Sequence, residues 1–174
     1  LRLVGSEMCI RDRVVFDSYM PKGWPQEEAC SLHTQFKKEE KLKNGVPLMG
    51  DVKGLLDTVK AKGYTIAMAT SASAEDVEFN LNNAGIQHYF EAIISDEMIT
   101  HGKPAPDVYL KTAQQLNLSP QECLVVEDSL NGVRAAFGAG TTVVMIPDKV
   151  QPTKEIKAMC NYILKSLDDL KEIV

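Results

Sequence analysis

Apolar residues recur along the chain in two alternating patterns, which predict a succession of strands and helices. Short continuous apolar runs rich in β-branched residues are typical of strands buried on both faces. Between these runs apolar positions recur at helical spacing, as at Val52, Leu55, Leu56 and Val59. We expect strands at 64–69, 92–94, 123–126, 142–146 and 162–164, and helices at 51–62, 74–84, 107–116, 130–137, 153–159 and 167–173.

This alternation predicts the α/β fold class, with a doubly wound parallel sheet that carries helices on both faces. A chain of 174 residues is typical of one domain and can bury roughly 70% of its unfolded surface. Local patterns support the helix bounds. Ser73 and Asp76 form a capping-box pattern, and Gly85 stands where a glycine would end the same helix.

The most informative polar positions follow the apolar pair Val125 and Val126, where Glu127 and Asp128 stand next to each other. A run that stops at acidic residues places them at the carboxyl end of a strand, the sheet edge at which α/β proteins bind ligands. Two carboxylates there suit Mg²⁺, which prefers oxygen ligands. The alternative is that both acids only stabilise the N-terminus of the next helix.

Hydroxyl residues end another apolar run, at Thr70 and Ser71. Because a helix follows them, a hydroxyl and backbone N–H groups lie at its entrance, and such an entrance binds phosphate well. The alternative is ordinary helix capping, because many strands of α/β proteins end in Ser or Thr.

A third segment places Lys103 between Gly102 and Pro104, directly before a helix. The proline biases the residue before it toward an extended backbone, so the base of the lysine is held in place. A lysine in this position can pair with a phosphate as a point charge. The alternative is a solvated surface lysine.

In this order and spacing, these segments resemble the haloacid dehalogenase superfamily, subfamily IA, and most closely its β-phosphoglucomutase-like branch. The resemblance implies a Rossmann-like core and Mg²⁺-dependent phosphoryl transfer from a small phosphorylated metabolite, such as a sugar phosphate. By the same resemblance Thr70 and Lys103 are catalytic residues. Thr70, the Ser71 backbone and Lys103 bind the phosphate, and Glu127 and Asp128 hold the metal.

One part of the family pattern is missing from the sequence. The family attacks phosphorus with the first Asp of an Asp-x-Asp motif after its first strand, and forms an aspartyl-phosphate. No such motif follows a strand here, and Asp17 is followed by Ser18 and Tyr19. We therefore expect an N-terminally truncated, inactive fragment. Residues 1–13 resemble a translated sequencing adapter, 14–46 the end of a helical cap, and 47–174 a core without its first strand.

The composition of the chain limits which partners and which cellular compartment we expect. The net charge of −5 disfavours nucleic acid, and no apolar run approaches the roughly 18 residues of a membrane helix. The four cysteines form no Cys-x-x-Cys pair and lie at no zinc-ligand spacing from a histidine, so we expect free thiols in a reducing compartment, the cytoplasm. Cys123 is expected inside a strand. We expect a monomer whose partner is a small phosphorylated metabolite.

Two other classes of protein share parts of this pattern. One is a catalytically inactive member of the same fold that binds a ligand or a protein. Its weakness is that folding alone does not require Thr70, Lys103 and Asp128 together. The other is a phosphoacceptor signalling domain, which uses similar residues. In that class the acids come first in the chain and the lysine last, which is not the order found here.

Overall fold

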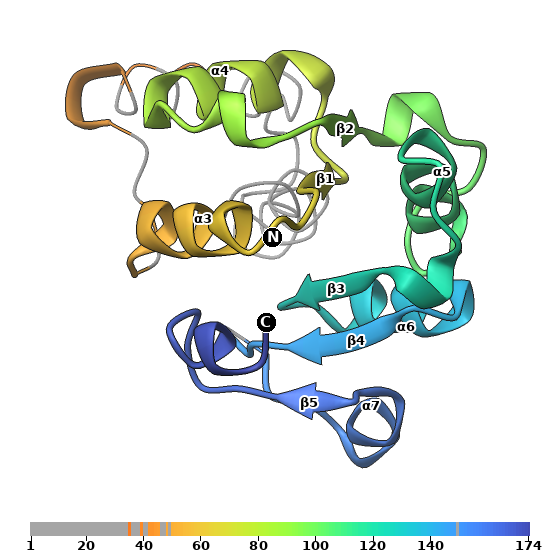
Figure 1. Cartoon of the computed structure of the whole chain (residues 1–174). Coiled ribbons are helices and arrows are strands. Elements are labelled where there is room, and N and C mark those ends of the chain that lie inside the picture. The colour runs from red at the N-terminus through yellow and green to blue at the C-terminus, as the bar shows by residue number, and fades with distance from the viewer. Residues whose placement is uncertain (1–34, 36–38, 40–41, 46–47, 49, 149) are drawn as a thin grey trace, which may run out of the picture.

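The computed structural model describes residues 35, 39, 42–45, 48, 50–148 and 150–174. Strands and helices alternate in this part of the chain (Figure 1), which confirms the α/β fold class. The strands are β1 (Ala67–Ala69), β2 (Ala92–Ile94), β3 (Leu124–Glu127), β4 (Thr142–Met145) and β5 (Tyr162–Ile163). The helices are α3 (Val52–Ala61), α4 (Ala74–Ala84), α5 (Asp107–Gln115), α6 (Leu130–Ala139) and α7 (Lys154–Met159).

Short 3₁₀ turns stand between these elements, namely η1 (Gln87–Tyr89), η2 (Asp96–Met98), η3 (Pro120–Glu122) and η4 (Asp169–Glu172). Residues 1–13, expected to be non-native, lie outside the described residues, as does most of the expected cap remnant 14–46. That division of the chain stays a prediction.

The ends of α4 confirm the capping pattern of the sequence. The Ser73 hydroxyl accepts a hydrogen bond from the backbone N–H of Asp76 at 3.2 Å. At the other end Gly85 adopts φ +67°, the left-handed conformation that glycine enters without a steric cost. Helix α3 begins in a similar way, because the Asp51 carboxylate accepts from the backbone N–H of Gly54 at 3.0 Å. These local contacts explain why the helix bounds could be predicted closely.

Two sequence-based expectations about local structure are wrong. The segment 167–173 was expected to be an α-helix, but only the 3₁₀ turn η4 forms there. The Asp169 carboxylate accepts from the backbone N–H groups of Lys165 and Ser166, so it closes a turn at the start of the segment. Cys123 was expected inside a strand, but its N–H completes η3 by donating to Pro120, and β3 begins one residue later.

The described strands form two parallel sheets. Strand β1 pairs with β2, and β4 lies between β3 and β5. Within the described residues no backbone hydrogen bond joins β1 to β3. In Figure 1 the two sheets lie in separate halves of the molecule, which α5 connects along the chain. Among the described residues the expected single sheet is thus not continuous, because no strand joins β1, which ends before Thr70, to β3.

Helices hold the two sheets in one core. Ile94 of β2 belongs to the same buried cluster as Val108 of α5, Val133 of α6 and Met145 of β4. On α3, Leu56 packs in a cluster with Met68 of β1, whereas Leu55 packs in a cluster with Val144 of β4. Because α3 and the cluster around α5 each reach both sheets, side-chain packing holds the carboxyl ends of β1 and β3 near each other.

We expect Leu55→Ala to destabilise the fold by about 2–5 kcal/mol, the usual cost of truncating a fully buried leucine. Leu55 is completely buried and packs against the half of the molecule that contains β4. Denaturant unfolding measures the change, with Lys53→Ala as the control, because Lys53 is exposed on the same helix. Equal stabilities of the two variants would contradict the role given to Leu55.

Candidate active site at the carboxyl ends of β1 and β3

Lys103 connects the two sheets at their carboxyl ends. Its Nζ donates a hydrogen bond to the carbonyl oxygen of Ala69 in β1 at 3.5 Å, and pairs with Glu127 Oε1 of β3 at 2.5 Å. The side chain of Lys103 is 5% exposed and that of Glu127 is 1% exposed. Lys103 is therefore not a solvated surface lysine, and its ammonium is held between the two sheets.

The loop that carries Lys103 is attached to the start of α5. The Asp107 carboxylate accepts from the backbone N–H of His101 at 3.1 Å and contacts the His101 ring at 3.0 Å. This bond to the His101 side chain lowers the pKa of the Asp107 carboxyl below its ordinary value. The Lys103–Pro104 peptide bond is cis. His101 itself points largely to solvent, at 72% exposure of its side chain, so it contributes to the loop more than to the site.

Glu127 is surrounded by donors on both of its carboxylate oxygens. Oε1 accepts from Lys103 and from the hydroxyl of Tyr109. Oε2 accepts from the backbone N–H groups of Asp128 at 3.2 Å and Ser129 at 3.3 Å, and from the Ser129 hydroxyl at 3.0 Å. A buried carboxylate is tolerated when donors replace the water that it has lost. The network thus explains how an acid can lie in the core here.

Helix α6 approaches Glu127 closely because position 132 is a glycine. A Cβ atom at Gly132 would overlap the carboxylate of Glu127. The helix begins at Ser129, whose hydroxyl accepts from the backbone N–H of Gly132 at 3.0 Å. Capping of α6 therefore falls to Ser129, whereas Glu127 lies beneath the first turn.

The two remaining candidates of the phosphate site lie at the end of β1. The backbone N–H of Thr70 donates to Ile94 of β2 at 2.9 Å, and its hydroxyl accepts from the N–H of Ala72 at 3.1 Å. Thr70 is buried and Ser71 half-buried, and Ala72 separates them from Ser73, the capping residue of α4. The structure thus brings Thr70 and Ser71 to the sheet edge that Lys103 spans.

Asp128 follows β3 directly and is half-buried. Together with Glu127 it offers carboxylate oxygens, which is the donor chemistry that Mg²⁺ prefers. Mg²⁺ is commonly bound through one or two carboxylates, several waters and substrate phosphate. The described residues contain no cluster of three or more His, Cys, Asp or Glu side chains arranged to hold a metal. The adjacent acids therefore supply suitable donor atoms for a partial Mg²⁺ site that needs further oxygen ligands, and Glu127 would exchange one of its present hydrogen bonds for the ion.

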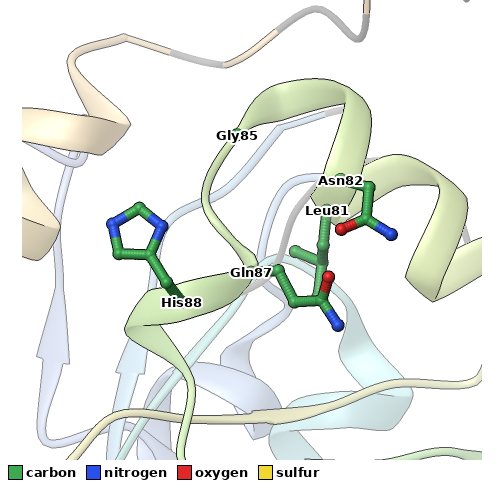
Figure 2. Close-up of a pocket in the computed structure, with 5 residues that line it drawn as sticks. All are labelled: Leu81, Asn82, Gly85, Gln87 and His88. Carbon is green, nitrogen blue, oxygen red and sulfur yellow. The ribbon is translucent and has the colours of Figure 1, made fainter.

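Other features of the described residues lie away from this edge. An open pocket of about 350 Å³ is lined by Leu81, Asn82, Gly85, Gln87 and His88. Figure 2 shows these five residues. The pocket stands at the far end of α4, about 16 Å along the helix from the Thr70 end. His88 is exposed in η1. Cys123 and Cys160 are free thiols. None of the helices in this part of the chain is long and apolar enough to cross a membrane.

Sequence reasoning identified the candidate site residues but not the residues that support them. Tyr109 and Ser129 hold Glu127 in place, and Gly132 leaves room for it. The spacing Ser129-x-x-Gly132 was visible directly after the acids. Tyr109 carried no comparable signal, because a tyrosine on the apolar face of a helix is typical of any core.

Comparison with known proteins places this geometry in a family. The model of the family described as "Haloacid dehalogenase-like hydrolase" matches residues 7–146, and this range includes every candidate site residue. The chain belongs to the haloacid dehalogenase-like hydrolase family, and its similarity to subfamily IA confirms the resemblance seen in the sequence. The matched range begins inside the segment 1–13, whose origin stays a prediction.

Individual relatives share parts of the chain. The bifunctional riboflavin kinase/FMN phosphatase of Arabidopsis thaliana is 31% identical over 118 residues, which is 67% of this chain and 31% of that protein. The fructose-1-phosphate phosphatase YqaB of Escherichia coli is 37% identical over 92 residues, 52% of this chain and 49% of that protein. The chain therefore spans at most half of the length of these two relatives.

A solved structure extends the similarity over nearly the whole chain. CbbY from Rhodobacter sphaeroides, crystallised with phosphate and, as a mutant, with xylulose-(1,5)bisphosphate, superposes with a TM-score of 0.74 at 26% sequence identity. The superposition covers 90% of this chain and 72% of CbbY. The parallel α/β core described above is thus the core of this family.

We expect Gly132→Ala to destabilise the protein by about 1–3 kcal/mol, the usual cost of overpacking. The added methyl would displace the Glu127 carboxylate, and this outweighs the gain of about 1 kcal/mol that alanine brings to a helix interior. Gly138→Ala on the same helix is the matched control, because its Cβ would meet Pro106 only at an ordinary 3.7 Å. Thermal unfolding should show a lower melting temperature for Gly132→Ala and no decrease for Gly138→Ala. Stabilisation by both substitutions would contradict the close approach of α6 to the Glu127 carboxylate.

Proposed function

We propose that this chain carries the phosphate- and metal-binding part of a Mg²⁺-dependent phosphoryl-transfer enzyme, a phosphatase or phosphomutase. One observation carries the proposal. A buried ammonium, Lys103, lies between the carboxyl end of β1, next to Thr70, and the acids that end β3. A cation, a helix entrance with a hydroxyl, and adjacent carboxylates together suit a dianionic phosphate and a divalent cation.

Each residue takes one role in this proposal. The Thr70 hydroxyl and the Ser71 N–H bind oxygens of the phosphoryl group that is transferred. Lys103 balances negative charge on that group, and Glu127 and Asp128 hold Mg²⁺, which when bound supplies further neutralisation. Phosphoryl transfer depends mainly on positioning and on charge stabilisation, so fixed donors at the edge of a rigid sheet are what the reaction requires.

The nucleophile belongs to a segment that the described strands do not include. We place it on a strand between β1 and β3, because each of these strands has one edge without a described partner. A parallel strand there would end beside Thr70, Lys103 and Asp128. An aspartate oxygen at its end would bond to phosphorus while the ester oxygen leaves with a proton. Water would then hydrolyse the aspartyl-phosphate and release inorganic phosphate.

The relatives and the charge of the site support a class of substrate. The matched proteins are named for FMN and fructose-1-phosphate, and CbbY was crystallised with a sugar bisphosphate. All of these compounds are phosphate monoesters of polyhydroxylated carbon chains. We propose a small metabolite of this kind as the substrate, a monomeric enzyme, and a location in the reducing cytoplasm, which the free thiols Cys123 and Cys160 support.

A catalytically inactive binding module is the second candidate, because the sequence contains no Asp-x-Asp after a strand. The two candidates differ in turnover and share phosphate binding. Sequencing the gene upstream of the codon for Val14 separates them first. An open frame that encodes a strand ending in Asp-x-Asp supports the enzyme, whereas a start codon close to Val14 supports the binding module.

Lys103→Ala in the full-length product of this gene should lower the rate of phosphate release by at least about 10²-fold, the scale for losing one preorganised charge-stabilising group. Release of inorganic phosphate from sugar phosphates measures the rate. Lys111→Ala is the control, because Lys111 lies in α5, the helix that follows the Lys103 loop, and is exposed. Among the contacts described, its ammonium donates only to the Met98 carbonyl. Equal rates for the two variants would refute the role of Lys103.

Asp128→Ala should abolish Mg²⁺-dependent turnover, because a hard cation loses one of its two carboxylates. The measurement is phosphate release as a function of Mg²⁺ concentration, with chelator added to parallel samples. Asp148→Ala, at an exposed residue after β4, is the control for the removal of one negative charge. Full activity of Asp128→Ala would refute the metal assignment.

A further inference from the structure

Tyr109 touches the same carboxylate oxygen as Lys103. Its hydroxyl donates to Glu127 Oε1, with which Lys103 Nζ is paired at 2.5 Å. Its ring lies below the same ammonium, with 5.0 Å from Nζ to the ring centroid. Tyr109 is 6% exposed, so both contacts are made away from bulk water. The tyrosine thus meets both members of the buried ion pair.

We propose that Tyr109 is a positioning residue, which orients Lys103 for the phosphoryl group by fixing Glu127 Oε1 and by lining the ammonium with its ring. This inference rests on the proposed function. A lysine side chain is long and flexible, so a single hydrogen-bond acceptor does not fix the position of its ammonium. Here the Ala69 carbonyl, Glu127 Oε1 and the aromatic face define one position.

The core of the protein keeps the tyrosine itself in place. Tyr109 is packed in the buried cluster that joins α5 to α6 and β4. The other oxygen of Glu127 is held independently, by the hydroxyl and N–H of Ser129. Glu127 is therefore held at both oxygens, by Tyr109 of α5 and by Ser129, the cap of α6. Removal of the Tyr109 hydroxyl takes one donor from the oxygen that Lys103 uses and leaves the bonds to the other oxygen in place.

The chemistry of the hydroxyl fits this role. A phenol O–H is a neutral donor, so it orders the carboxylate without a second positive charge that would compete with Lys103 for it. The face of the ring attracts a cation within about 6 Å of its centre. A buried tyrosine hydroxyl is usually hydrogen-bonded whether or not it has a function. The test must therefore distinguish an effect on the position of Lys103 from an effect on the stability of the fold alone.

Tyr109→Phe and Tyr89→Phe form a matched pair for this test. Each removes one hydroxyl that donates to a carboxylate; Tyr89 donates to Asp57 Oδ1 at 2.6 Å, between η1 and α3. Tyr109→Phe keeps the ring and its packing. Two measurements are made on the full-length protein and both variants. One is kcat and KM for phosphate release with Mg²⁺, and the other is the rate of Lys103 acetylation by limiting acetic anhydride, followed by mass spectrometry.

We expect Tyr109→Phe to lower kcat by about 10-fold with little change in KM, because misplaced catalytic groups cost rate more than binding. Lys103 acetylation should rise by about 2- to 10-fold, the factor that corresponds to one net hydrogen bond. Tyr89→Phe should leave both values at those of the wild type. A lower melting temperature of Tyr109→Phe with unchanged kcat and unchanged acetylation would show a merely structural tyrosine and overturn the inference.

The same experiment keeps the inference separate from the proposed function. If the wild type releases no phosphate, the proposed function is wrong, and Lys103 acetylation alone decides whether Tyr109 positions the lysine. If the wild type is active but Tyr109→Phe matches it in kcat and in acetylation, the proposed function stands and the inference is wrong.

Discussion

The buried pair of Lys103 and Glu127 is the interaction on which the candidate site depends. Removing two opposite charges from water costs several kcal/mol per ion, and their attraction offsets this only where geometry is good and other donors complete the carboxylate. Here Tyr109, Ser129 and the backbone complete it. Such a pair adds little to net stability, so its position between the two sheets is more easily explained by function.

The surrounding structure can be understood as support for that pair. The close first turn of α6 requires glycine at 132, since any side chain there would overlap Glu127. The loop before α5 is attached through Asp107 to the backbone of His101 and brings Lys103 to the end of β1. Clusters around α3 and α5 hold both sheets, although no described backbone hydrogen bond joins β1 to β3. Among the described residues, packing of side chains therefore holds the two sheets together, as backbone hydrogen bonds hold neighbouring strands within one sheet.

The gap that the described strands leave between β1 and β3 connects the fold with the proposed chemistry. Strand edges with unpaired N–H and C=O groups readily accept another strand. A strand there would deliver its carboxyl end to the point where Lys103 contacts both sheets. The described strands and helices form the core of the family. The proposed nucleophile belongs to a segment beyond these strands, so the core alone does not account for the proposed activity.

The sequence by itself determined the order of elements and the residue types at the sheet edge. Capping at Ser73 and Gly85 and the apolar runs are local, so the bounds of α4 and β2 could be predicted to the residue. The adjacent acids, Thr70 and Lys103 were recognisable by type and order. Only the tertiary structure decided that Lys103 is buried against Glu127 and that Tyr109 shares this oxygen. These facts depend on contacts between residues 18 to 34 positions apart, which no local pattern encodes.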